Sequence, residues 1–174
     1  MAPKQKPGRS KQDYRTPPEF LAAVKAKFGI DEFDWDLAAT RDFDSMTDTS
    51  VSERCFTESD DALADDSIWP ANGGWNWLNP PYAHIAPWVK KAWESLSERG
   101  AHTLMLVPAG VGANWWRDWV HDKAFVYLLN GRISFDGNAP YPKDCVLLAY
   151  GHSDPESMYD VWTWTTDIPK EPSA

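Results

Sequence analysis

The clearest chemical signal in this sequence is the run Asn79-Pro80-Pro81-Tyr82, here called the NPPY motif. It directly follows the run WNWL at 75–78 and directly precedes a helical pattern. Proline can neither donate a hydrogen bond to a sheet nor continue a helix, so the chain must turn here. The Asn79 amide oxygen and the Pro80 carbonyl accept hydrogen bonds, the two prolines stiffen the backbone that carries them, and Tyr82 offers a flat face for stacking. A site that works through hydrogen-bond acceptors and a stacking face needs no covalent nucleophile.

Strands and helices are expected to alternate around this motif. The run TLMLVP is continuously apolar, as in a strand buried on both faces. Strand, helix, strand, helix, strand indicates two right-handed crossovers in a mainly parallel sheet with helices on both faces. Ligands of such sheets bind beyond the carboxyl ends of the strands, which is where the NPPY motif lies. The expected strands are 75–78, 103–108 and 125–129, separated by a helix that ends at Gly100, with Trp88, Ala92, Trp93 and Leu96 on one face, and by a helix over about 115–120.

Further elements are expected on either side of this unit. Thr16 is expected to cap a helix that starts at Pro17-Pro18 and ends at Gly29. The segment 40–74 is polar and weakly periodic. The remaining expected strands are FDWDLAA (33–39), which passes into a turn, a short one near 54–56, RISF (132–135) after an Asn130-Gly131 turn, and CVLLAY (145–150).

The composition is that of one soluble globular domain. The chain has 174 residues and an apolar fraction of 43%, with no apolar run long enough to cross a membrane. We expect a basic arm at 1–13, one domain at 14–168 and a tail at 169–174. The first residues lack the apolar segment of a signal peptide, which predicts a cytoplasmic location. The two cysteines and four histidines show no ligand spacing, so no metal site is expected.

The charge distribution gives a mixed signal about partners. The net charge is −9, and an acidic balance counts against nucleic-acid binding, which normally shows a basic footprint. The first 15 residues are the exception, because they hold five basic side chains against one acid. This arm is the part of the chain expected to attract phosphate.

A strand, NPPY and a helix in this order resemble the catalytic motif of methyltransferases that act on adenine N6. From about Tyr14 to Gly151, the chain resembles the small phage-type DNA N6-adenine methyltransferases, a Dam-like family. The resemblance implies a compact, truncated Rossmann-like fold of the S-adenosylmethionine-dependent methyltransferases. It also implies a double-stranded DNA substrate and, for a phage-encoded chain, the host cytoplasm. Beyond NPPY, the resemblance depends on the order and spacing of TPPEF, FDWDLAA, FTESDDAL, WNWLNPPYAHIAPWV, LMLVPA, WW and LNGRISF.

The implied reaction explains the residue types of the motif. The adenine amine is conjugated with its ring and is a poor nucleophile. Acceptors at Asn79 and Pro80 would draw it toward a nucleophilic state and stabilise the positive charge that develops during attack on the sulfonium methyl. Pro81 would keep the loop rigid, and Tyr82 would stack on the base once it is flipped from the duplex.

The resemblance also implies a cofactor site, although the glycine-rich motif common among methyltransferases is missing after FDWDLAAT. Asp36 would accept hydrogen bonds from the cofactor ammonium or ribose beside the small residues Ala38 and Ala39. Thr16 and Pro17 would line the methionine side, and Asp61 would accept from the cofactor adenine. Each of these residues also has a purely structural interpretation. Asp36 would be a turn residue, Thr16 only a helix cap and Asp61 a solvated acid.

Four residues are candidates for contact with DNA. Trp115 and Trp116 would form a lip over the base pocket, unless they pack in the core. Phe135 would cover the flipped base from the side opposite Tyr82, and Arg132 would contact a phosphate. The recognised sequence and the oligomeric state are not predicted, and loops such as 40–74 or 109–117 are expected to read the bases.

Two rival functions compete with this interpretation, and two kinds of cytosine methylation fit the motif less well. Release-factor glutamine methyltransferases use NPPY but resemble a longer chain with a glycine-rich cofactor motif. A catalytically silent nucleic-acid-binding module could keep the fold, and cytosine N4 methyltransferases have serine more often at the first motif position. Cytosine C5 methylation needs a thiolate, whereas Cys55 and Cys145 are expected to be small core residues.

Overall fold

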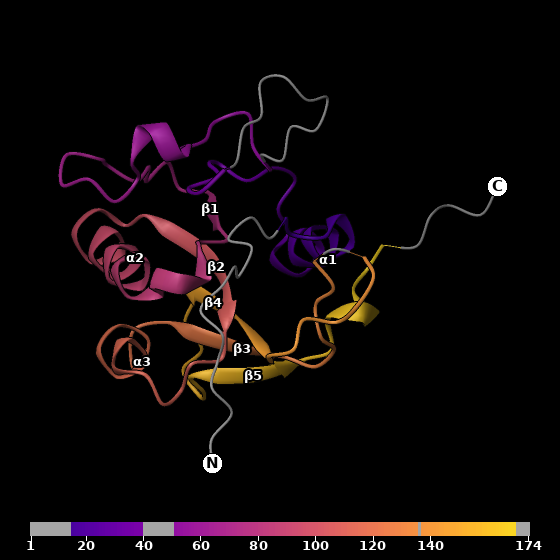
Figure 1. Cartoon of the computed structure of the whole chain (residues 1–174). Coiled ribbons are helices and arrows are strands. Elements are labelled where there is room, and N and C mark those ends of the chain that lie inside the picture. Colours follow the sequence, from indigo (N-terminus) through magenta and orange to yellow (C-terminus); the bar gives the residue numbers. More distant parts are fainter. Residues whose placement is uncertain (1–14, 40–50, 136, 170–174) are drawn as a thin grey trace, which may run out of the picture.

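The computed structural model describes residues 15–39, 51–135 and 137–169 (Figure 1). The expected basic arm at 1–13, most of the expected tail and part of the segment 40–74 lie outside these residues. The helices are α1 (Pro18–Phe28), α2 (Ile85–Arg99) and α3 (Asn114–Trp119), with short 3₁₀ turns at Glu58–Asp60, Tyr82–His84 and Trp164–Thr166. The strands are β1 (Trp75–Leu78), β2 (His102–Pro108), β3 (Phe125–Leu129), β4 (Cys145–Tyr150) and β5 (Tyr159–Trp162).

The five strands form one sheet in the order β1-β2-β4-β3-β5. β1 pairs with β2 and β3 pairs with β5 in parallel, while β4 is antiparallel to both of its neighbours, β2 and β3. Four strands therefore run in one direction and only β4 opposes them. The first predicted crossover, β1-α2-β2, joins neighbouring strands. The second joins β2 to β3, which are not neighbours because β4 lies between them.

The sheet continues past β1 through two short segments. Asp36 forms parallel bridges with Trp77 of β1 on one side and with Cys55 on the other. Backbone bonds from Leu37 N to Trp77 O and from Phe56 N to Asp36 O, at 2.9 and 2.8 Å, hold these segments in register. The expected strands at 33–39 and 54–56 are thus present only as bridges.

The C-terminal half differs from the prediction in two places. Residues 132–135 form no strand, because Arg132 pairs with Asp144 and the Tyr141 amide donates to the Ile133 carbonyl, so the β3–β4 connection closes on itself. Strand β5 was not predicted. Its run YDVW is short, and three of its four residues are exposed, so it lacks the apolar pattern of a buried strand.

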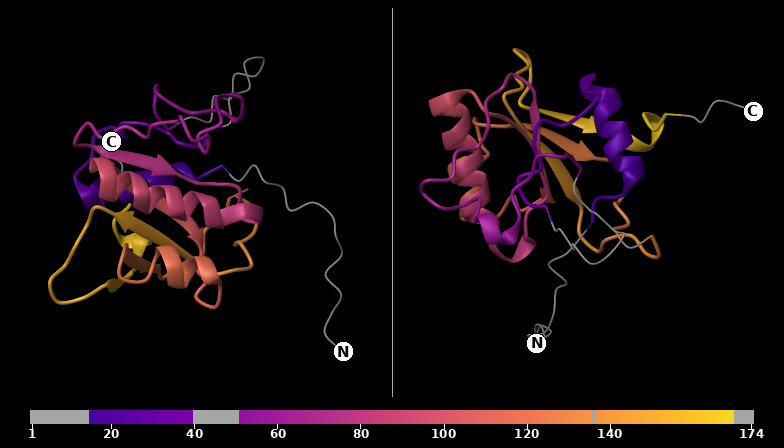
Figure 2. Two further views of the ribbon diagram at one scale, coloured as in Figure 1. Left: turned by 90° about the vertical axis from the view of Figure 1, so that its left-hand side faces the viewer. Right: turned by 90° about the horizontal axis from the view of Figure 1, so that it is seen from above.

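Helices cover both faces of the sheet, as predicted. Phe20 and Val24 of α1 pack with Trp77 and Leu147 on one face. Val89 of α2 packs on the other face, where the tryptophans of α3 also lie. In the view from above in Figure 2, α1 and α2 lie on opposite sides of the sheet.

The helix ends follow the glycine signals in the sequence. Gly29 and Gly100 end α1 and α2 in the left-handed conformation, at φ 63° and 74°. At the start of α1 the prediction was wrong, because Pro17 occupies the N-cap position and no side chain caps the helix. The predicted face of α2 is rotated, since its buried apolar residues are Ile85, Val89 and Ala92, with Trp88, Trp93 and Leu96 half-buried beside them.

Within the described ranges, no helix has the length and apolar character needed to cross a membrane.

The core prediction concerns Leu147 at the centre of β4. This side chain is fully buried and its strand lies between β2 and β3. Leu147→Ala should lower the free energy of unfolding by about 2–5 kcal/mol, because a cavity remains in a packed sheet. Val161→Ala is the control: Val161 is 59% exposed on β5, so the change should stay within about 0.5 kcal/mol. Urea denaturation measures both, and equal losses would contradict the assignment of the core.

Candidate functional site

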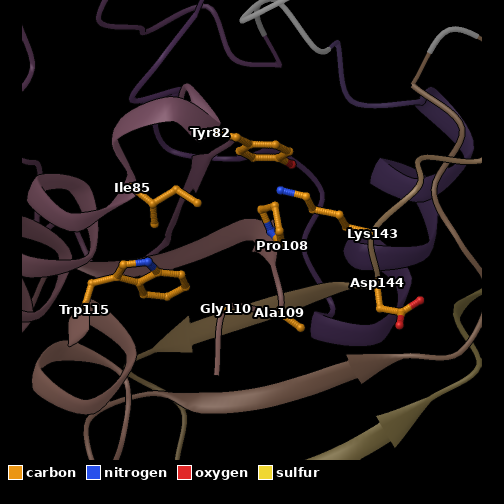
Figure 3. A pocket seen from close by; sticks show the side chains of 8 residues that line it. All are labelled: Tyr82, Ile85, Pro108, Ala109, Gly110, Trp115, Lys143 and Asp144. Atoms are coloured by element: carbon orange, nitrogen blue, oxygen red, sulfur yellow. The ribbon is translucent and has the colours of Figure 1, made fainter. Parts of the chain in front are cut away.

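A pocket opens beyond the carboxyl ends of β1 and β2. Its volume is about 430 Å³, within the usual range for small-molecule sites. Figure 3 shows Tyr82 of the NPPY motif, Trp115 of α3 and Lys143 of the β3–β4 loop around it. The sequence motif therefore lies at a cavity, as the position of a strand end predicts. The lining residues are Tyr82, Ile85, Pro108, Ala109, Gly110, Trp115, Lys143 and Asp144.

The first residue of the motif is tied to the entry of α1. Asn79 directs its amide nitrogen at the Thr16 hydroxyl oxygen, at 3.1 Å. Thr16 is only 7% exposed, and 63 positions separate the two residues in the chain. The predicted cofactor residue Thr16 and the predicted catalytic residue Asn79 are thus brought into direct contact.

Tyr82 belongs to a cluster of three aromatic rings. Its ring centroid lies 6.1 Å from that of Phe135 and 5.8 Å from that of Tyr141, and both contacts are edge to face. A base between two parallel rings needs a separation of roughly 7 Å, twice the contact distance of carbon atoms. Phe135 thus packs against Tyr82 with the two rings not parallel, and its expected role as a cover over the flipped base stays a prediction. Tyr141 was not predicted, because it reaches the motif through a loop with no periodic signal.

Of the two predicted lip residues, only Trp115 lines the pocket. Its indole lies against the Gly110 backbone so closely that an added β-carbon would come within 2.3 Å of Trp115 Cζ2. Trp116 packs on Trp115 at 5.6 Å and adjoins the core beneath α2. Trp116 therefore supports Trp115, and the absence of a side chain at Gly110 makes room for it.

The β3–β4 loop supplies polar groups that the sequence reading missed. Lys143 and Asp144 both line the pocket, and Lys143 is the basic side chain among the lining residues. The Asp144 carbonyl accepts from Ala109 N at 2.9 Å, which fixes the end of the loop to the end of β2. Arg132, predicted to contact phosphate, instead pairs with the Asp144 carboxylate at 3.1 Å, with its side chain 52% exposed. An ion pair this exposed is weak, so Arg132 can exchange it for another anion.

Asp36 lies at the same edge of the sheet, just before the end of its short strand. The residue is 4% exposed, and its carboxylate accepts hydrogen bonds from Ala38 N at 3.1 Å and from Val51 N at 3.2 Å. Because Leu37 N donates to Trp77 O, Ala38 lies at the same carboxyl edge as the NPPY motif. Asp36 thus has a structural task, because its carboxylate holds the backbone at Ala38 and Val51.

The other two predicted cofactor residues differ in their surroundings. Pro17 is buried beside Thr16. Asp61 is exposed in a left-handed turn at φ 46°, and within the described part of the chain its hydrogen bonds all go to residues 63–67. The structure therefore places Asp61 in a turn, and no described contact joins it to the other predicted residues.

The sequence predicts that neither cysteine serves as a nucleophile. Burial, together with the nearby Asp144 charge, raises the pKa of the Cys145 thiol to about 12. At neutral pH this thiol is protonated, so it does not supply the thiolate that cytosine C5 methylation requires. Among residues 15–39, 51–135 and 137–169, no three His, Cys, Asp or Glu side chains group as metal ligands would.

Comparison with known proteins gives two matches. The family described as DNA N-6-adenine-methyltransferase (Dam) matches residues 4–145 of the chain. A protein of Escherichia phage T1, named DNA N-6-adenine-methyltransferase, is 27% identical over 127 residues, which are 72% of this chain. The matched part is 48% of that relative, so the chain spans about half of the relative's length. No solved structure matches the chain.

The site prediction concerns Asp36. In Asp36→Asn one carboxylate oxygen becomes an amide donor, which then faces a backbone N–H of Ala38 or Val51. We expect the free energy of unfolding to fall by about 1–3 kcal/mol, the cost of an unsatisfied buried donor. Asp31→Asn, at an exposed position after α1, is the matched control and should be neutral. Urea denaturation with equal midpoints for both variants would show that the two backbone bonds to Asp36 add nothing to stability.

Proposed function

Because the chain belongs to the DNA N-6-adenine-methyltransferase (Dam) family, we propose that it transfers a methyl group from S-adenosylmethionine to the N6 amine of a flipped adenine in double-stranded DNA. The family supports DNA adenine methylation in general. We propose in addition that S-adenosylmethionine is the methyl donor, that the NPPY motif is catalytic and that the adenine is flipped out of the duplex. The single observation that carries it is the position of the NPPY motif, whose tyrosine lines the pocket while its asparagine is anchored to Thr16.

The motif is suited to an amine that must be made nucleophilic. The Asn79 amide oxygen and the Pro80 carbonyl are the two acceptors for the N6 hydrogens. As the N6–C bond forms and the S–C bond of the sulfonium breaks, positive charge develops on N6, and these dipoles stabilise it. The extra proton leaves N6 for solvent after transfer. Rigid prolines hold the acceptors in place before the reaction, so little reorganisation is needed.

The edge of the sheet beside the motif suits the proposed donor. S-adenosylmethionine supplies an electrophilic methyl on a cationic sulfur. Asp36 offers a carboxylate to the cationic ammonium, and Ala38 and Ala39 leave the backbone close to it accessible. Pro17 lies beside Thr16 at the entry of α1, which is the proposed methionine side. The sheet order and the single antiparallel strand support the truncated Rossmann-like fold proposed for such a cofactor.

The pocket suits a purine that has left the duplex. Tyr82 gives it a stacking face, and Trp115 closes the opposite part of the lining. Lys143 at the pocket and the exchangeable Arg132 are the described groups best placed to receive backbone phosphates. DNA therefore approaches along the β3–β4 loop, in addition to the segments 40–74 and 109–117 expected to read bases.

Asn79→Ala tests the proposed function. We expect the variant to bind DNA and S-adenosylmethionine within about twofold of wild type, yet to lose methyl transfer by roughly 100-fold or more, because the lost interaction strengthens mainly in the transition state. The measurement is transfer of labelled methyl to DNA, followed by nucleoside analysis. Label on cytosine or on protein in the wild type, or undiminished transfer by Asn79→Ala, would refute the proposal.

The stacking role of Tyr82 gives a separate prediction. Tyr82→Ala should weaken productive DNA binding by about 1–3 kcal/mol, the usual contribution of a base–aromatic contact. Tyr82→Phe keeps the ring and should retain most activity. The ratio kcat/KM for DNA methylation measures both variants. Equal losses in the two would assign the effect to the hydroxyl and not to stacking.

A further inference from the structure

The contact between Thr16 and Asn79 joins two rigid parts of the molecule. Thr16 immediately precedes Pro17 and Pro18, whose fixed φ angles start α1. Four residues after Thr16, Phe20 packs edge-on against Trp77, with ring centroids 6.4 Å apart. Trp77 lies on β1, and Asn79 follows two residues later, directly after the end of that strand. The two ends of the hydrogen bond are therefore carried by elements that are themselves packed together.

The direction of this hydrogen bond matters for the proposed chemistry. An asparagine amide is planar, with the oxygen and the nitrogen on opposite branches. Only the oxygen can accept a hydrogen from the adenine amine, whereas the reversed amide would oppose two donors. In the structure the Asn79 nitrogen faces the Thr16 hydroxyl at 3.1 Å, so the amide oxygen lies on the other branch.

We propose that Thr16 is a positioning residue, which holds the Asn79 amide in place through its nitrogen so that the amide oxygen is presented to the N6 amine. This inference rests on the proposed function and deepens it. It adds to the role expected from the sequence, in which Thr16 caps α1 or lines the methionine side of the cofactor. In this role Thr16 acts on catalysis through Asn79.

Three substitutions separate this role from a structural one. Thr16→Val keeps the shape of the side chain but removes the hydroxyl, and Thr16→Ser keeps the hydroxyl. The matched control is Thr103→Val on β2, since Thr103 is fully buried and its hydroxyl makes no hydrogen bond among the described residues. DNA that lacks N6-methyladenine is the substrate, with S-adenosylmethionine as the donor.

Thr16→Val should lower kcat by about three- to tenfold, the factor that corresponds to one neutral hydrogen bond. The dissociation constant for S-adenosylmethionine, measured by calorimetry, should stay within about twofold. Thr16→Ser and Thr103→Val should keep kcat within about twofold. A kcat for Thr16→Val within twofold of wild type, or a loss confined to cofactor affinity, overturns the proposal.

A double substitution tests whether Thr16 acts through the Asn79 amide. Asn79→Ala removes the amide that Thr16 contacts, and its residual methyl transfer provides the second background. Adding Thr16→Val to Asn79→Ala should therefore lower kcat by less than twofold. The same three- to tenfold loss in both backgrounds would show independent effects and contradict the proposal.

Nuclear magnetic resonance keeps this inference separate from the proposed function. The side-chain NH₂ signals of Asn79, assigned by their loss in Asn79→Asp, should shift in Thr16→Val and stay near their wild-type positions in Thr16→Ser and Thr103→Val. Wild-type protein without any DNA methylation would refute the proposed function, while these signals would still test the contact. Unchanged signals in Thr16→Val overturn the positioning role, whatever the activity.

Discussion

The parallel pairing along β1 is the constraint on which the site depends. The Trp77 amide donates to the Trp35 carbonyl and the Trp77 carbonyl accepts from the Leu37 amide, while β1 pairs with β2 on its other side. Parallel strands end at the same edge, so this pairing gathers Asp36, the NPPY motif and the end of β2 there. The buried side chain of Trp77 also contacts α1 through Phe20, which brings Thr16 to the motif.

The elements around β1 were predictable because their sequence signals are local and strong. WNWL and TLMLVP are apolar runs, and Gly29 and Gly100 stop their helices in a conformation that glycine adopts easily. The errors in the predicted secondary structure lie where tertiary contacts determine the local conformation. The β3–β4 loop contains RISF, a good strand sequence, yet Ile133 anchors it in the core and the Arg132–Asp144 pair closes it. β5 pairs with β3 despite its exposed outer face.

The residues of the site that belong to a sequence motif could be predicted. Tyr82 of the NPPY motif and Trp115 line one pocket, and Thr16 contacts Asn79. Tyr141, Lys143 and Asp144 could not be found, because antiparallel β4 brings their loop to the carboxyl ends of the other strands and no local pattern records that approach. A ligand role for Asp36 could be predicted from the sequence, but the two backbone hydrogen bonds that its carboxylate accepts could not.

The activity proposed for the carboxyl edge beside β1 is methylation of adenine in DNA. It can be tested by sequencing modified bases in DNA from cells that express the protein, with cells lacking their own adenine methylation as host. We expect N6-methyladenine within a defined sequence context, present with the wild-type chain and absent from cells without it. Unmodified adenine at normal levels of folded protein, or modification of cytosine in its place, would contradict it.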